Sequence, residues 1–182
     1  MALPKRVALK PLSFIHSIKK KLMSGITKPV NKLEAFICKM SAYPMPYILL
    51  SVLITDIIIS CIFSYILFPD YSSGLTFTSP IEEFFLVVLF APIFETLIFQ
   101  SFIIKKSLQY FNNDKVVAVI ISALLFGLTH YYSFPYIIKA TIAGALYGLL
   151  YFIIKKQNKE PYIYIALVHA TYNLIGFAIN HL

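Results

Sequence analysis

The stretch from residue 84 to residue 104, FFLVVLFAPIFETLIFQSFII, is strongly apolar, and Glu95 is its only charged side chain. A transmembrane α-helix needs about 20 consecutive, mainly apolar residues. We therefore expect this segment to cross a membrane as a helix. Because a charged group is costly inside a bilayer, Glu95 needs a specific reason to be there.

Four further apolar runs surround this segment, at residues 46–68, 116–132, 136–154 and 161–180. The chain of 182 residues is 59% hydrophobic and only 13% charged, whereas a soluble domain is about a quarter charged. The sequence therefore predicts an all-α fold, a polytopic transmembrane helical bundle with about five membrane spans. The transmembrane domain covers residues 46–180.

The run 136–154 carries small residues at four-residue spacing, which are Ala140, Gly144 and Gly148. Small residues at this spacing let two helix backbones approach closely. We expect this face to pack against a neighbouring helix of the same chain, with a dimer interface as the alternative.

Residues 1–45 are basic and hold nine of the 16 Lys and Arg residues. They form either a partly amphipathic helix on the membrane surface or a solvated cytoplasmic tail. The apolar residues of the amphipathic pattern are Leu12, Phe14, Ile15, Ile18 and Leu22. The chain has a net charge of +8, but its basic residues flank apolar spans, so they indicate contact with the lipid bilayer and no nucleic acid partner.

The basic residues also predict the orientation. Loops 105–115 and 155–160 carry three lysines each, whereas loop 69–83, turn 133–135 and the C-terminal end carry none. Cytoplasmic loops are enriched in Lys and Arg. We therefore predict a multi-pass protein of the cell membrane with a cytoplasmic N-terminus and an outside C-terminus.

Several polar side chains fall at similar depths within the predicted spans. At 1.5 Å per residue, Glu95, His130 and His169 lie about 14, 21 and 12 Å from the cytoplasmic ends of their helices, and Asn173 about 18 Å. All four are near the middle of a hydrocarbon core about 30 Å thick. Asp56 reaches a similar depth, and its role stays open between a supporting and a structural one.

A glutamate, two histidines and an asparagine at one depth can hold and activate a water molecule. Glu95 would be the general base, and His130, His169 and Asn173 would orient the water and stabilise an oxyanion. The alternative for each polar residue alone is a hydrogen bond between helices. Lys139 lies near the outer end of its helix and can extend to the interface without any function.

Three motifs in chain order resemble the CPBP family of intramembrane proteases (CAAX proteases and bacteriocin-processing proteins, also called Abi). Residues 91–100, APIFETLIFQ, occupy the place of a Glu-Glu-x-x-x-Arg motif; residues 126–130, FGLTH, match Phe-x-x-x-His; and residues 169–173, HATYN, match His-x-x-x-Asn. The resemblance covers residues 81–180 and implies peptide cleavage in or beside the membrane.

The first motif departs from the family pattern, because Thr96 and Gln100 stand in place of the second Glu and the Arg. We expect these neutral residues, one helical turn apart, to face each other and support the Glu95 helix, as Phe126 supports His130. Two histidines could also bind a divalent metal such as zinc, with His130 and His169 as ligands. The cofactor stays open.

The sequence thus predicts an intramembrane endopeptidase that cleaves a membrane peptide or protein substrate with water activated by Glu95. The context would be bacteriocin processing or self-immunity, with CAAX-type processing less favoured. The first alternative is a non-catalytic membrane scaffold of the same fold that binds a membrane partner. The second is a small transporter or proton relay, for which a sequence repeat and paired half-helices would be expected.

Overall fold

The computed structural model describes residues 32–69 and 75–181. The predicted surface helix, with Leu12, Phe14, Ile15, Ile18 and Leu22, lies outside the described residues. The described end of the basic tail forms a helix over residues 32–40, in which Ile37 is buried in the main hydrophobic core.

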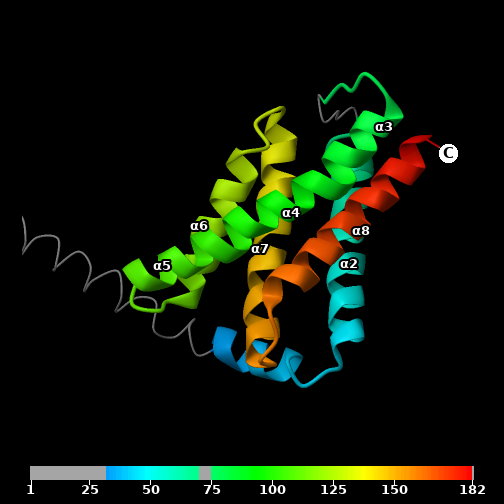
Figure 1. Cartoon of the computed structure of the whole chain (residues 1–182). Helices are drawn as coiled ribbons and strands as arrows, with labels where there is room; N and C mark the ends of the chain where they lie inside the picture. Colours follow the sequence, from blue (N-terminus) through cyan, green and yellow to red (C-terminus); the bar gives the residue numbers. More distant parts are fainter. Residues whose placement is uncertain (1–31, 70–74, 182) are drawn as a thin grey trace, which may run out of the picture.

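Every regular element of the described residues is helical (Figure 1). The first long helical stretch is α2 (Met45–Cys61) continued by the π-helix η1 (Ile62–Leu67). The second is one rod made of α3 (Pro80–Glu83), η2 (Phe84–Phe90), α4 (Ala91–Glu95), η3 (Thr96–Ile103) and α5 (Ile104–Tyr110). The chain ends with α6 (Lys115–Leu128), α7 (Phe134–Lys156) and α8 (Pro161–His181).

Within the described residues, four helical stretches are long and apolar enough to cross a membrane: Met45–Leu67, Pro80–Tyr110, Phe134–Lys156 and Pro161–His181. They correspond to four of the five predicted spans, although residue 68 falls just outside the first stretch, and this confirms the all-α membrane bundle. The remaining span, predicted at 116–132, is the 14-residue helix α6, about 21 Å long at 1.5 Å per residue.

Helix α6 is shorter than predicted because both of its ends are defined by local interactions. At the start, the Asp114 side chain accepts hydrogen bonds from the N–H groups of Val116 (2.9 Å) and Val117 (3.1 Å). Such an N-cap satisfies donors that have no partner in the first turn. At the other end, the helix stops before Thr129, and a turn leads into α7.

The small-residue face of α7 packs against α6, as predicted for a neighbour in the same chain. A Cβ atom built on Gly144 would lie 3.0 Å from the Phe126 ring and 3.1 Å from the Ala123 Cα, and one on Gly148 would lie 3.3 Å from Val119. The two backbones therefore approach closely. Since α6 ends beside this contact, the packing positions Phe126 and the histidine that follows it.

The rod that crosses the bundle diagonally in Figure 1 changes its hydrogen-bonding pattern around Pro92. Proline has no N–H, so Pro92 cannot make the backbone hydrogen bond expected of a residue within a helix. The flanking segments η2 and η3 adopt π-helical hydrogen bonding. Short π-helical segments inside helices are frequent at functional sites. Here they flank the short helix α4, which ends at Glu95.

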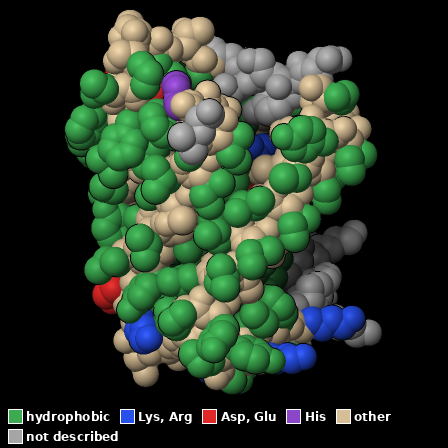
Figure 2. Space-filling model, turned by 90° about the vertical axis from the view of Figure 1, so that its right-hand side faces the viewer, with side chains coloured by type: hydrophobic (Ala, Val, Ile, Leu, Met, Phe, Trp, Pro, Cys, Tyr) green, Lys and Arg blue, Asp and Glu red, His purple; other side chains and the backbone are tan. Residues whose placement is uncertain are grey.

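The two ends of the bundle separate the loops as the lysine pattern predicts. The α5–α6 and α7–α8 connections lie at the lower end in Figure 1, whereas α3, the α6–α7 turn and the C-terminal end lie at the upper end. Figure 2 shows hydrophobic side chains over most of one face and basic side chains gathered at its lower edge. The assignment of the lower end to the cytoplasm stays a prediction.

Candidate active site

The candidate site forms where α4, the C-terminal end of α6 and the middle of α8 meet. Glu95 ends α4, His130 follows α6 by two residues, and His169 lies in α8. The side chains of Glu95, His130 and His169 are 26%, 11% and 7% exposed. Three helices therefore bring together the three ionisable groups that the sequence placed at one depth, and the site is largely closed to the surroundings.

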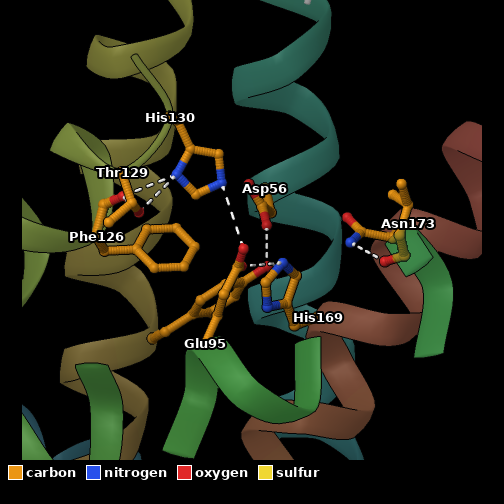
Figure 3. Close-up of polar contacts among 9 residues, drawn as sticks. Asp56, Glu95, Phe126, Thr129, His130, His169 and Asn173 are labelled. Atoms are coloured by element: carbon orange, nitrogen blue, oxygen red, sulfur yellow. Dashed lines mark hydrogen bonds and ion pairs between the residues drawn. The ribbon is translucent and has the colours of Figure 1, made fainter. Parts of the chain in front are cut away.

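The two imidazole rings approach different oxygens of the same carboxylate (Figure 3). Nε2 of His130 lies 4.0 Å from Oε1 of Glu95, and Nε2 of His169 lies 3.7 Å from Oε2. Both separations are longer than a hydrogen bond. Catalytic hydrogen bonds are often long in a structure without substrate and shorten in the substrate complex. The geometry fits a carboxylate that exchanges protons with a third molecule between the rings.

His130 is held through its other ring nitrogen. Nδ1 lies 2.7 Å from the carbonyl oxygen of Phe126, which can only accept, so Nδ1 carries the proton and donates. The hydroxyl of Thr129 donates to the same oxygen at 2.7 Å. These bonds satisfy a carbonyl at the end of α6 that has no donor in a following helical turn. In neutral His130, Nε2 is therefore an acceptor that faces Glu95.

Phe126 contacts both histidines, and its predicted supporting role stays a prediction. Its ring centroid lies 4.8 Å from that of His130 and 5.8 Å from that of His169, and its side chain is buried. The Phe-x-x-x-His spacing therefore does two things at once. It places the Phe126 carbonyl where Nδ1 can reach it, and it packs the Phe126 ring against both imidazoles.

His169 is buried among aromatic rings and lacks a hydrogen-bond partner at Nδ1 in the described structure. Its ring lies 5.2 Å from the ring of Tyr147, which is itself fully buried. The Tyr147 hydroxyl donates to Oδ2 of Asp56 at 2.6 Å. Asp56 therefore has a hydrogen-bond partner in a neighbouring helix, the same tyrosine whose ring packs against His169.

Sequence reasoning did not predict Tyr147, because a neutral tyrosine in an apolar run carries no charge that marks it. A signal was present. Tyr147 directly precedes Gly148, in the tightly packed part of α7, and a buried carboxylate such as Asp56 requires a donor nearby.

The structure does not bring Asn173 to Glu95, contrary to expectation. The Asn173 side chain points away from the carboxylate, and its Nδ2 donates to the carbonyl oxygen of Val87 at 2.8 Å (Figure 3). The missing backbone donor at Pro92 explains this contact. The Ala91 N–H donates to Leu86, and Pro92 has no N–H to offer, so the amide of Asn173 supplies a donor to Val87.

The expected contact between Thr96 and Gln100 is also different from the prediction. Both side chains are buried, at 0% and 1% exposure, as befits residues that support the Glu95 helix. However, neither the Thr96 hydroxyl nor the Gln100 amide has a hydrogen-bond partner in the described structure. Both residues belong to η3, whose wider π-helical turn does not stack residues four apart as an α-helix does.

Three or more His, Cys, Asp or Glu residues arranged to hold a metal ion are not found in the described part of the chain. Two nitrogens, Nε2 of His130 and Nε2 of His169, face the Glu95 carboxylate, whereas a catalytic zinc site usually has three protein ligands. Zinc binding by these histidines therefore stays a prediction.

These features define a class: a polytopic membrane protein whose helices enclose a glutamate between two histidines. The chain belongs to the Type II CAAX prenyl endopeptidase Rce1-like family, whose family model matches residues 77–175, more than half of the chain. This match confirms the predicted resemblance and spans Glu95, His130, His169 and Asn173. Comparisons with curated proteins and with solved structures give no match.

Proposed function

We propose that the chain is an intramembrane endopeptidase in which Glu95 activates the attacking water. Membership of a family of CAAX prenyl endopeptidases supports protease activity. The observation that carries the glutamate mechanism is the pairing of one carboxylate with two histidines. Each oxygen of Glu95 faces a different imidazole Nε2, at 4.0 and 3.7 Å.

The protonation of His130 supports a water molecule between it and Glu95. Nδ1 holds the ring proton, so Nε2 of neutral His130 and the ionised carboxylate of Glu95 are both acceptors. Two acceptors cannot bond to each other directly. A water molecule can donate one hydrogen to each of them, which turns its oxygen lone pairs towards a substrate carbonyl.

Catalysis then needs two proton transfers. Glu95 takes a proton from the water as its oxygen forms a bond to the carbonyl carbon of the scissile peptide. The carbonyl oxygen becomes an oxyanion, which Nε2–H of His169 stabilises as a hydrogen-bond donor. Protonated Glu95 then gives its proton to the amide nitrogen, and the C–N bond breaks. The products are a carboxylic acid and an amine, and Glu95 is again ionised.

The substrate in this proposal is a peptide anchored in or at the lipid bilayer. The depth of Glu95 within a membrane-length helix requires that the scissile bond reach the membrane interior. The family match favours CAAX-type cleavage. Bacteriocin processing and self-immunity draw no support from it and stay hypotheses about the biological context.

A comparison of the purified chain with its Glu95→Gln variant tests the proposal. Both would be placed in lipid nanodiscs with farnesylated and unprenylated membrane peptides, and cleavage would be followed by mass spectrometry. Glu95→Gln keeps the shape but cannot accept the proton, so we expect cleavage to slow by roughly 100-fold or more. Glu160→Gln, the same substitution in an exposed loop residue, should cleave like the unmodified chain.

Two outcomes would contradict this function. Cleavage by folded Glu95→Gln at the unmodified rate would exclude Glu95 as the base. The alternative, a non-catalytic scaffold, predicts that no peptide is cut and that Glu95→Gln still binds its membrane partner. The buried but unpaired Thr96 and Gln100, which replace charged residues of the family motif, are the observation that favours this alternative.

A further inference from the structure

His169 is held in a different way from His130. Nδ1 of His130 donates to the Phe126 carbonyl at 2.7 Å, and this bond orients its ring. Nδ1 of His169 has no hydrogen-bond partner within the described residues, and the side chain is only 7% exposed. A hydrogen bond at one ring nitrogen commonly fixes the tautomer and direction of a histidine. What turns Nε2 of His169 towards Glu95 is therefore packing.

Two aromatic rings pack against the His169 imidazole. The ring centroid of Tyr147 lies 5.2 Å from that of His169, with 38° between the planes, and the Phe126 centroid lies 5.8 Å away at 71°. The centroids of Phe126 and Tyr147 are themselves 6.3 Å apart. These spacings are typical of aromatic contacts. The three rings form a closed triangle, so the imidazole cannot rotate unless another ring moves.

Tyr147 is the member of this triangle that is fixed at both ends. Its backbone lies in the part of α7 where Gly144 and Gly148 approach α6 closely. At the far end of the ring, its hydroxyl donates a 2.6 Å hydrogen bond to Asp56 in α2. Tyr147 and Asp56 are each only 1% exposed. A short hydrogen bond to a carboxylate is stronger than one between neutral groups, so it holds the ring in one place.

Asp56 reaches His169 through this tyrosine and not directly. The imidazole makes its ion-pair contact with Glu95, and its Nδ1 has no partner within the described residues. Figure 3 places Asp56 close to His169 without a bond between them. Asp56 could still act through its charge, as it does in attracting Lys139. The short bond to Tyr147 favours a mechanical role, which needs an acceptor oxygen and no charge.

We propose that Asp56 and Tyr147 are positioning residues for the reaction, because their hydrogen bond locks the ring that keeps Nε2 of His169 directed at Glu95. The proposal rests on the protease function above. Nε2 of His169 lies 3.7 Å from Oε2 of Glu95, and in that mechanism it donates to the oxyanion. A group displaced by about 1 Å loses much of its effect on the reaction. Asp56 and Tyr147 thus act through His169 and not on the substrate itself.

The same lock favours the tautomer that the mechanism needs. With its proton on Nε2, His169 donates towards the carboxylate of Glu95. With the proton on Nδ1, a buried donor would have no acceptor within the described residues, and the Nε2 lone pair would face a carboxylate. A ring held in one direction therefore also keeps one tautomer, and the tautomer can be measured without any substrate.

Nitrogen-15 NMR of the full-length chain in nanodiscs tests the positioning without cleavage. The histidines would be labelled, and the His169 ring signals would be assigned by their loss in His169→Gln. At a pH where the imidazoles are neutral, we expect the unmodified chain to show one tautomer, with the proton on Nε2. Asp56→Leu and Tyr147→Phe should give a mixture of both tautomers. Tyr151→Phe, one turn later on the same helix, should resemble the unmodified chain.

Cleavage of the farnesylated peptide measures the consequence for the reaction. We expect Tyr147→Phe and Asp56→Leu to lower kcat about tenfold and to change KM less than about twofold, because the substrate still binds. Asp56→Asn keeps an oxygen that can accept from Tyr147, so it should retain kcat. The double variant Asp56→Leu/Tyr147→Phe should be no slower than either single variant, because the two residues act as one unit. Ser122→Ala loses a different buried hydrogen bond and should keep kcat.

The outcomes separate this inference from the protease function. A tautomer mixture already in the unmodified chain, or one unchanged tautomer in Tyr147→Phe, would overturn the positioning role. So would an Asp56→Asn variant as slow as Asp56→Leu, since Asp56 would then act by its charge. If Asp56→Leu does not fold, Tyr147→Phe and Asp56→Asn decide the question. A mixture with unchanged kcat would overturn the inference and leave the protease standing. A mixture in a chain that cuts no peptide would leave the lock on His169 standing and overturn the protease.

Discussion

Nδ1 of His130 donates a hydrogen bond of 2.7 Å to the carbonyl oxygen of Phe126, one helical turn earlier. This bond decides which nitrogen faces the glutamate. Because the proton sits on Nδ1, the Nε2 atom that points at Glu95 has a free lone pair. The bond therefore links the end of a helix to the chemistry of the site.

His130→Asn separates these two roles. The Asn amide can take the place of Nδ1–H and keep the bond to Phe126, but it has no group at the position of Nε2. We expect the variant to fold with nearly unchanged thermal stability and to cleave peptide roughly 100-fold more slowly. Thr129→Val removes the second donor to the same carbonyl and should change activity little. An active His130→Asn variant would show that Nε2 takes no part.

The buried pair of Asp56 and Tyr147 gives a second prediction. Tyr147→Phe leaves the carboxylate of Asp56 buried without its donor, which should lower the free energy of unfolding by about 1–3 kcal/mol. In an Asp56→Asn background the same change should cost less, because a neutral amide is cheaper to bury. Denaturant unfolding in detergent would measure this coupling as a double-mutant cycle.

Tyr151→Phe, on the same helix one turn later, is the matched control for this cycle. It should cost the same in both backgrounds, since Tyr147 is the tyrosine that bonds to Asp56. If Tyr147→Phe also costs the same in both, the 2.6 Å contact contributes nothing specific to stability.

A third prediction concerns Asn173, whose amide bonds to Val87 instead of the site. Asn173→Ala leaves the Val87 carbonyl without this donor, so we expect a loss of about 1–3 kcal/mol in stability. Asn173→Asp should cost more, because it places an acceptor against an acceptor. Asn180→Ala, at an exposed position on the same helix, is the control. A stable Asn173→Ala variant with strongly reduced turnover would instead support the catalytic role that the sequence suggested.

These residues show how far sequence reasoning reaches. Glu95, His130 and His169 could be placed together because charged or titratable groups inside membrane spans are expensive, and their depths follow from helix rise alone. The same rule located Asp56. The rule does not identify the partner of Asp56, because Tyr147 carries no charge and its contact with Asp56 depends on how α2 and α7 pack.

The predicted position of the Asn173 side chain differs from the structure for a different reason. Residues four apart share a helix face only within about 40°. The carbonyl oxygen of Val87 has no backbone donor, and it determines the direction of the Asn173 amide. The donor is missing because of the π-helical segments around Pro92. Apolar periodicity in the sequence does not reveal the change from α to π hydrogen bonding. The missing bond between Thr96 and Gln100 has the same origin.

The buried side chains of Thr96 and Gln100 therefore offer a fourth prediction. Thr96→Val and Gln100→Met remove polar atoms that have no hydrogen-bond partner while keeping similar volume. We expect the double variant to gain about 1–3 kcal/mol in the free energy of unfolding, because a buried unsatisfied polar group is costly. Ser122→Ala is the control, since its buried hydroxyl donates to Phe99 at 2.9 Å and its loss should destabilise the chain. If the double variant and Ser122→Ala both lower the free energy of unfolding, Thr96 and Gln100 hold a bound group.

The last prediction concerns which end of the bundle faces the cytoplasm. The nine basic residues of the tail and the lysines of loops 105–115 and 155–160 predict a cytoplasmic lower end, because positive loops are retained on that side. Reporter fusions at residue 75 and after the C-terminus should both report outside, and fusions at residues 112 and 158 should report inside. Inverted signals at all four positions would reverse the orientation. Opposite sides for residue 75 and the C-terminus would mean that one of the helices between them, most simply the short α6, does not cross. The depth argument for His130 would then fail, while its contact with Glu95 would remain.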